Sequence, residues 1–352
     1  MFARNAWYIA CTRAEISEKP LARTLLNDPV VLFQTEAGTP CALEDRCCHR
    51  GAPLSLGYAT PAGIRCGYHG MEFGPDGKCT DIPGQTIIPA KAKVKSYPLV
   101  ADGDYVWIWM GDPEKADASQ VVSYPPDDPV KWPRANDMLH LQASYVMVLE
   151  NLMDLSHLSY LHKSSIGSSE EDSANASMDV TRTDRGMRFL RVMRNADAPA
   201  NWRKRYPIGD KVDRWSDFEF VAPCSIVQFS GGVKAGEYDQ GKRDGYHLVR
   251  TLHAVTPETD KSCFYFFNKA DGYAQFEDPN KVRTWASTTD VFKEDAFMLE
   301  QQQLRLNGYD TSQLMDINTD VARVRMIRAL NDFIRRDQGI DAHPSSAGVA
   351  AQ

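Results

Sequence analysis

Two short stretches of the sequence, RCCHRGAP and RCGYHG, each place cysteine and histidine beside glycine or proline. Cys47 and His49 have the spacing C-x-H, and after sixteen intervening residues Cys66 and His69 have the spacing C-x-x-H. Glycine and proline favour tight turns, so each pair is expected on a loop, and two such loops can close over one object. Two thiolates and two imidazoles can hold a two-iron cluster in which histidines replace the cysteines on one iron.

This pattern predicts a Rieske [2Fe-2S] cluster whose ligands are Cys47, His49, Cys66 and His69. The alternatives are a structural zinc site, which usually groups its cysteines in one C-x-x-C turn, and a set of free buried cysteines. Cys48 lies between the two ligands of the first loop, and we expect it to be a small buried residue under that loop. A third loop, residues 81–85, is expected to cover the cluster and limit its access to water.

A second group of residues suited to chemistry lies in the stretch NLMDLSHLSYLH. Its many apolar residues predict a buried helix, in which Asn151, Asp154 and His157 are three apart and form one polar stripe. Buried polar groups must be satisfied, and a metal would satisfy these. His162 would point about 140° away from His157 on a regular helix, so we expect a π-bulge or a break near Ser159.

A third stretch, TDVFKEDAFMLE, predicts a helix with an apolar face formed by Val291, Phe292, Met298 and Leu299. Asp295 lies in the middle of this face, whereas Lys293 and Glu294 are expected to point elsewhere. Two histidines and one carboxylate form the facial triad that holds Fe(II) with open positions for oxygen. The sequence therefore predicts a mononuclear iron site whose ligands are His157, His162 and Asp295.

Each of these three residues also has an ordinary structural interpretation. Taken separately, His157 would be a hydrogen-bonded core residue and His162 an exposed residue at a helix end. Asp295 would be a helix acid paired with a neighbouring arginine.

The elements around the motifs predict two domains. Short apolar and β-branched runs broken by turn residues, as in VKSYPLVADGDYVWIWMGDP, predict a mostly β domain over residues 1–115. A proline-rich and acidic connection follows, and residues 116–340 are expected to form the second domain. The tail 341–352 is expected to be disordered, and residues 164–185 to be either a lid over the second site or a disordered surface segment. The stretch RVRMIRALNDFIRR predicts an amphipathic helix packed against the second domain.

Composition excludes several classes of protein. The chain has 352 residues, of which 25% are charged and 43% hydrophobic, as is usual for a soluble globular protein. The formal net charge of -7 does not provide the basic surface of a nucleic-acid binder. No window approaches the ~18 apolar residues that span a bilayer, and the start MFARNAWYIACTRAEI lacks the apolar core of a signal peptide. We therefore expect a cytoplasmic protein that binds neither membranes nor nucleic acids.

The whole set of motifs resembles the oxygenase component of the Rieske non-haem iron oxygenases. RNAWYIAC, RCCHRGAPLSLG, CGYHGMEF, NLMDLSHLSYLHKSSIG and FKEDAFMLEQQQ are most similar to vanillate O-demethylase oxygenases. CCHR and WIWMGDP are also similar to the toluenesulfonate methyl-monooxygenases, and dicamba O-demethylase is a more distant relative. The resemblance runs over nearly the whole chain, and its one visible departure is Cys48, where many relatives have proline. It implies an α+β protein with an N-terminal Rieske β-sandwich and a helix-grip catalytic domain of the START/Bet v 1-like kind.

The resemblance also implies a reaction. The expected substrate is a vanillate-like methoxylated aromatic acid, which is O-demethylated to a phenol and formaldehyde with O2. Electrons would come from NADH or NADPH through a separate flavin and ferredoxin-type reductase. The alternative reactions are hydroxylation of an aryl methyl group and ring dihydroxylation. A pure electron carrier would leave the second domain without a purpose, and a non-catalytic helix-grip binder would leave the first without one.

The resemblance further implies a head-to-tail homotrimer in which the cluster of one chain serves the iron of the next. Asp154 matches the residue that connects the two centres, linking His69 of a neighbouring chain to His157. Asn151, on the same polar stripe, is expected to support the iron ligands.

Overall fold

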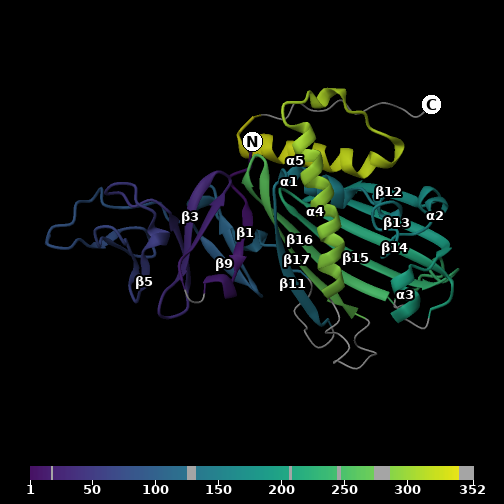
Figure 1. Ribbon diagram of the computed structural model, residues 1–352, viewed down its shortest axis with the longest axis horizontal. Coiled ribbons are helices and arrows are strands. Elements are labelled where there is room, and N and C mark those ends of the chain that lie inside the picture. Colours follow the sequence, from purple (N-terminus) through teal and green to yellow (C-terminus); the bar gives the residue numbers. More distant parts are fainter. Residues whose placement is uncertain (17–18, 125–131, 206–207, 244–246, 273–285, 341–352) are drawn as a thin grey trace.

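The computed structural model describes residues 1–352 apart from 17–18, 125–131, 206–207, 244–246, 273–285 and 341–352 (Figure 1). The N-terminal part contains three antiparallel sheets, which confirms that it is mostly β. Their orders are β1-β10-β9, β2-β3-β4 and β5-β6-β7-β8. The strands are β1 (Trp7–Thr12), β2 (Leu21–Leu25), β3 (Asp28–Gln34), β4 (Pro40–Glu44), β5 (Tyr58–Thr60), β6 (Gly63–Arg65), β7 (Glu72–Phe73), β8 (Cys79–Asp81), β9 (Leu99–Asp102) and β10 (Tyr105–Trp109).

The C-terminal part is built on one seven-stranded antiparallel sheet, in the order β11-β17-β16-β15-β14-β13-β12. The strands are β11 (Arg134–Leu141), β12 (Ser177–Arg182), β13 (Gly186–Asp197), β14 (Lys211–Val221), β15 (Ser225–Lys234), β16 (His247–Thr259) and β17 (Ser262–Asp271). The helices are α1 (Tyr145–Met153), α2 (Glu170–Ala174), α3 (Ala200–Arg205), α4 (Ala286–Leu306) and α5 (Val321–Asp337).

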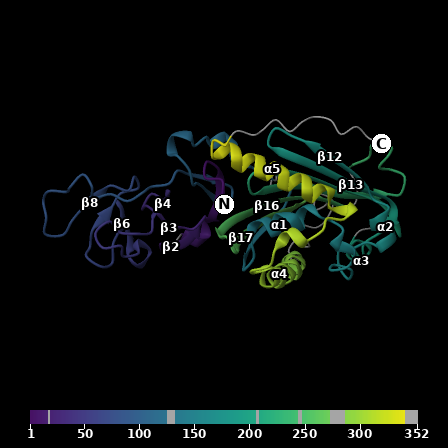
Figure 2. The same cartoon turned by 90° about the horizontal axis from the view of Figure 1, so that it is seen from above.

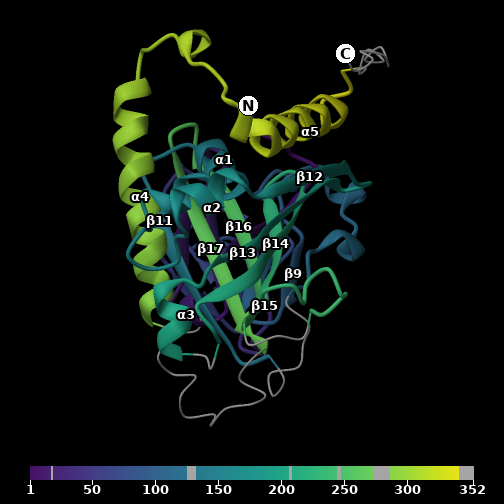
Figure 3. The same cartoon turned by 90° about the vertical axis from the view of Figure 1, so that its right-hand side faces the viewer.

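Long helices and a curved sheet together form the predicted helix-grip arrangement. Helix α1 contacts β16, β17, α4 and α5, and α4 runs beside β11 (Figure 3). Helix α5 crosses β12 and β13, and it buries Ala322, Met326 and Leu330, which are four residues apart on one stripe. This confirms the predicted packing of the C-terminal amphipathic helix.

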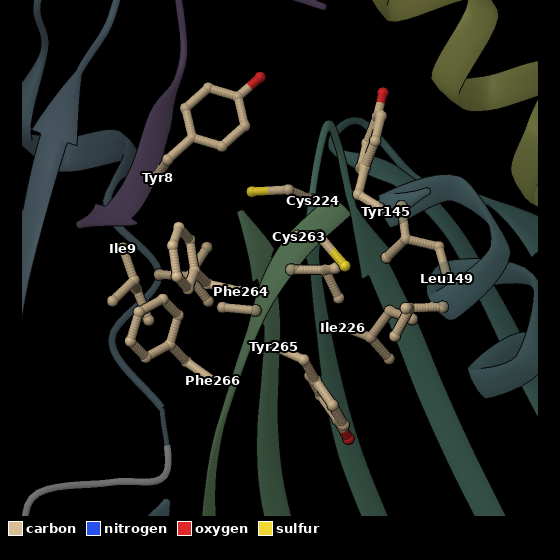
Figure 4. Packing of buried hydrophobic residues seen from close by; sticks show 14 of the residues in the cluster. Tyr8, Ile9, Tyr145, Leu149, Cys224, Ile226, Cys263, Phe264, Tyr265 and Phe266 are labelled. Atoms are coloured by element: carbon tan, nitrogen blue, oxygen red, sulfur yellow. The ribbon is translucent and has the colours of Figure 1, made fainter. Parts of the chain in front are cut away.

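The two parts share one apolar core at β16 and β17 (Figure 4). Phe264 and Phe266 of β17 are buried against the N-terminal part, where Ile9 of β1 is also buried. The Thr256 hydroxyl donates to the Ile9 carbonyl at 2.7 Å. Burial of each large apolar side chain contributes roughly 1.5–3 kcal/mol, so this contact fixes the two parts relative to each other.

The segment 164–185 contains regular structure, which differs from the disordered surface segment that was one of its two expected forms. It includes α2 and the edge strand β12, which pairs with β13 from Ser177 to Arg182. The short polar residues that suggested a loop cap a helix instead, since the Ser169 hydroxyl accepts from the Asp172 N–H. The predicted tail lies outside the described residues, and the domain boundary near residue 115 stays a prediction. No helix in the described part of the chain combines the length and apolar character needed to cross a membrane.

Candidate metal centres

The two cysteine–histidine loops have the same backbone geometry although their spacings differ. In each loop the N–H of the cysteine donates to the carbonyl five residues later, at 2.8 Å from both Cys47 and Cys66. The N–H of the residue four positions later donates back to the cysteine carbonyl, at 2.9 Å from Gly51 and 3.1 Å from Gly70. These glycines have φ of +73° and +75°, a conformation that other residues rarely adopt. Glycine at this position therefore allows both loops to turn in the same way.

The side chains of the two loops divide into a buried pair and an exposed pair. Cys47 and Cys66 are 3% and 2% exposed and lie against each other. His49 and His69 are exposed, with ring centroids 4.6 Å apart. A Rieske cluster needs this division, with one iron on two inner thiolates and the other on two outer imidazoles. Burial raises the pKa of Cys47 to about 11, so a thiolate there needs a positive partner such as iron.

Neighbouring residues hold the second loop in place. The Arg65 guanidinium donates to the Gly70 carbonyl at 2.6 Å and to the Asp81 carboxylate at 2.8 Å. A Cβ on Gly70 would come within 2.9 Å of the Pro83 ring, so the predicted third loop lies against the second ligand loop. Arg65 also forms an ion pair with Glu72. The second ligand loop is thus tied to β6, β7 and β8 by direct contacts.

The prediction that Cys48 is buried under its loop is wrong, because the residue is exposed. The side chain of Cys47 points into the protein at this turn, and the side chain of Cys48 therefore points toward solvent.

The predicted single helix over the second motif is also wrong in part. Helix α1 ends at Met153, and Asp154 has extended backbone angles of φ −112° and ψ 109°. A short 3-10 helix then covers His157–Ser159. The break expected near Ser159 therefore comes before His157, and the polar stripe on one helix does not form. This break nevertheless brings the His157 and His162 imidazoles together, which is the reason a break was predicted.

The imidazoles of His157 and His162 come together beside Asp295 of helix α4. Their ring centroids are 5.3 Å apart, and their Nε2 atoms lie 3.4 Å and 3.0 Å from the Asp295 carboxylate. The three ligand atoms all lie within 4.8 Å of one another. Asp295 is 7% exposed on α4, while Met298, which was predicted on the same apolar face, is exposed. Two imidazoles and one carboxylate in this arrangement match the donor set of a facial Fe(II) site.

Two further side chains hold these ligands. The Asn151 amide of α1 donates to the Asp295 carboxylate at 3.1 Å, a contact that fits the supporting role expected of it. Glu294 was expected to point away, but its carboxylate lies 2.7 Å from His162 Nδ1. That contact keeps the proton on Nδ1 and leaves the Nε2 lone pair for a metal. Helix periodicity predicted that Glu294 points away from Asp295, and it could not show that the chain segment carrying His162 returns to meet Glu294.

The structure places His253, which belongs to none of the predicted sites, on the same side of the sheet as α4. Its ring contacts Phe292, which precedes Asp295 by about one helical turn, at a centroid distance of 5.8 Å. Its nitrogens lie 2.7 Å from the Tyr265 hydroxyl and 2.8 Å from the Gln228 amide oxygen. Burial lowers the pKa of His253 to about 3, so the ring is neutral. A lone histidine in an alternating strand gives no sequence signal of this environment.

Comparisons with known proteins agree with this geometry. Residues 6–98 match the Rieske [2Fe-2S] domain, and residues 141–336 match the vanillate O-demethylase oxygenase C-terminal domain. The chain is 34% identical over 350 residues to a vanillate O-demethylase oxygenase subunit of a Pseudomonas strain, covering 96% of both chains. It is also 34% identical over 342 residues to a putative toluene-4-sulfonate monooxygenase system iron-sulfur subunit of Comamonas testosteroni, covering 96% and 99%.

A solved structure extends the likeness to three dimensions. The crystal structure of dicamba monooxygenase bound to dicamba superposes with a TM-score of 0.83 at 30% identity, over 96% of this chain and 99% of that one. The chain therefore belongs to the Rieske non-haem iron oxygenases, as an oxygenase component that carries a [2Fe-2S] cluster and a mononuclear iron.

Proposed function

We propose that this oxygenase removes the methyl group from a methoxylated aromatic acid, with formation of a phenol and formaldehyde. The observation that carries the proposal is the joint presence of the buried His157, His162 and Asp295 set and the two cysteine–histidine loops. The likeness of the chain to oxygenase subunits that act on vanillate supports the choice of substrate. The ligands of the cluster are Cys47, His49, Cys66 and His69.

The overall reaction consumes one O2, two electrons and two protons for each methyl group. One oxygen atom enters the methyl C–H bond and the other leaves as water. The resulting hemiacetal breaks its C–O bond to give the phenol and formaldehyde. When bound, the cluster supplies single electrons and the mononuclear iron supplies oxygen activation.

The protein's own contribution is to position the iron ligands and keep the site apolar. Asn151 and Glu294 fix the orientation of Asp295 and His162 through direct hydrogen bonds. The ring of Phe292 on α4 lies against the rings of Tyr265 and Phe267 on β17, which also contact each other. An aromatic cluster on the helix that carries Asp295 suits a flat aromatic substrate and limits the access of water.

The electrons come from a separate NAD(P)H-dependent reductase, in keeping with relatives that are named as subunits of multicomponent systems. The cluster loops join β4 to β5 and β6 to β7 in the N-terminal part, whereas α4 lies on the C-terminal part (Figure 2). A homotrimer in which one chain's cluster approaches the next chain's iron would bring the two centres close enough for electron transfer. Exposure of His49 and His69 allows such an approach.

Asp154 is suited to connect the two centres. Its backbone hydrogen-bonds the His157 imidazole, and its Oδ1 accepts from the Ser156 N–H at 2.8 Å. The second carboxylate oxygen makes no hydrogen bond to the described residues, so it is available to His69 of a neighbouring chain.

Formaldehyde release tests the proposal. Iron-replete protein, NADH and a surrogate reductase are incubated with vanillate and related methoxybenzoates. Formaldehyde in equal amounts with the NADH and O2 consumed establishes O-demethylation. Oxygen uptake that yields a diol or a benzyl alcohol without formaldehyde would replace it with ring dihydroxylation or methyl hydroxylation.

A further inference from the structure

Two buried arginines lie close together on the sheet, outside the iron site already described. Arg191 of β13 and Arg214 of β14 are 4% and 8% exposed. In the register of these strands, Arg191 faces Ser216 and Arg214 faces Met193. Since side chains alternate along a strand, both guanidiniums lie on one face of the sheet and are diagonal neighbours.

This face is the one that carries α4 and the iron site. Phe218 follows Ser216 by two residues on β14 and stacks on His253 at a centroid distance of 6.4 Å. His253 in turn contacts Phe292 of α4. On the same face the Arg214 guanidinium lies 5.2 Å from the ring centroid of Trp202, which belongs to α3.

Among the described residues, the two arginines donate hydrogen bonds only to neutral oxygens. Arg191 donates to the Ser173 hydroxyl at 2.8 Å, and Arg214 donates to the Ile166 carbonyl at 2.9 Å and the Ser168 hydroxyl at 3.2 Å. Within the part of the chain that the structure describes, no carboxylate forms an ion pair with either guanidinium. Asp154 favours the charge of Arg191 electrostatically but makes no such contact.

Two buried positive charges without a paired anion are unfavourable. Desolvation is only partly offset by hydrogen bonds to neutral groups, and the like charges repel each other. Burial, with a further contribution from Arg191, lowers the pKa of Arg214 to about 10. Other arginines of the same sheet are paired, as Arg188 is with Asp217. Since neither guanidinium is paired with a carboxylate among the described residues, both can bind an anion.

The chain links this arginine pair directly to an iron ligand. Ile166 and Ser168 follow His162 by four and six residues, and the N–H groups of Ser165 and Gly167 donate to the His162 carbonyl at 3.0 Å and 2.9 Å. An anion held by Arg191 and Arg214 would thus lie against the same turn of chain that positions His162.

We propose that Arg191 and Arg214 form the site that binds the anionic group of the aromatic substrate, a carboxylate or a sulfonate. This inference rests on the proposed function in so far as the ligand is a substrate. Guanidinium groups suit these planar or tetrahedral oxyanions because each can offer two parallel N–H donors. The competing interpretation is that both arginines only clamp the 166–173 segment to the sheet.

Ligand binding distinguishes the two interpretations without requiring turnover. Isothermal titration of the iron-replete protein compares vanillate, 4-methoxybenzoate and toluene-4-sulfonate with uncharged vanillyl alcohol. Arg191→Gln and Arg214→Gln are each expected to weaken binding of the acids roughly 10- to 100-fold while the alcohol changes less than about twofold. Arg188→Gln, the same substitution on the opposite face of β13, is expected to leave both kinds of ligand unchanged.

Several results would overturn the site. Equal losses for the acids and the alcohol would assign the arginines to clamping alone, and unchanged affinity for the acids would remove them from binding. Should a glutamine variant fail to fold, Arg214→Lys keeps the charge but loses the paired donors, and it must reduce the preference for acids over the alcohol. A wild-type protein without that preference also contradicts the proposal. If the acids bind through the arginines but release no formaldehyde, the anion site stands and only the proposed O-demethylation is contradicted.

Discussion

The contact between Glu294 and His162 allows a quantitative prediction about the iron site. Glu294→Gln keeps the shape of the side chain but replaces a charged acceptor with a neutral amide. The 2.7 Å contact to His162 Nδ1 then weakens or is lost. Because this contact sets the tautomer and orientation of the ring, its loss should lower the affinity of the site for metal.

The size of the effect follows from the geometry. Loss of a hydrogen-bonding partner behind a metal ligand typically costs 10- to 100-fold in affinity. The side chain of Glu294 is 41% exposed, so water screens its charge and can replace part of the contact. We therefore expect a loss near the lower limit, about tenfold, which corresponds to about 1.4 kcal/mol.

Competition with a fluorescent chelator measures the affinity for Fe(II) under anaerobic conditions, or for Co(II) in air. Lys293→Gln is the matched control, since Lys293 is the preceding residue on α4 and pairs only with Asp290 among the described residues. Asp295→Asn sets the upper limit by removing a ligand. An affinity of Glu294→Gln within twofold of the wild type would refute the reasoning.

Three other changes follow from the described contacts. Cys48→Ser should leave the visible and EPR spectra of the cluster unchanged because Cys48 is exposed; loss of the cluster would make it a ligand. Asp154→Asn should leave both metal sites filled, as metal analysis checks, but reduce turnover at least tenfold, whereas normal turnover contradicts the connecting role. The pKa of His253 is about 3 in the folded protein and about 6.5 unfolded, so the unfolded chain binds more protons between these values. His253 should therefore lower the free energy of unfolding by about 2 kcal/mol as the pH falls from 7 to 5. Urea unfolding of His253→Gln should not show this part of the pH dependence.

The sequence was sufficient to predict that the cysteines and histidines of the two cluster loops come together, because their chemistry and spacing are local. The C-x-H and C-x-x-H loops contain both donors and the glycines that shape them, so Cys47 and Cys66 could be assigned without knowledge of the sheet. The outward position of Cys48 was missed, because spacing does not show which side of a turn a residue occupies.

Residues that depend on sheet register could not be predicted. Arg191 and Arg214 are 23 positions apart in sequence, and only the pairing of β13 with β14 makes them neighbours. Likewise, Glu294 reaches His162 only because helix α1 ends before His157. The periodicity of the sequence does not predict where this helix ends.

The iron content of three proteins tests the central claim most directly. Wild-type protein should contain about three irons per chain, of which two belong to the cluster. Cys47→Ser should retain about one iron and lose the cluster spectrum, whereas Asp295→Asn should retain about two and keep it. These opposite losses would show that the two centres are separate and held by the residues named here. Loss of all iron from both variants, or of none from either, would contradict the account.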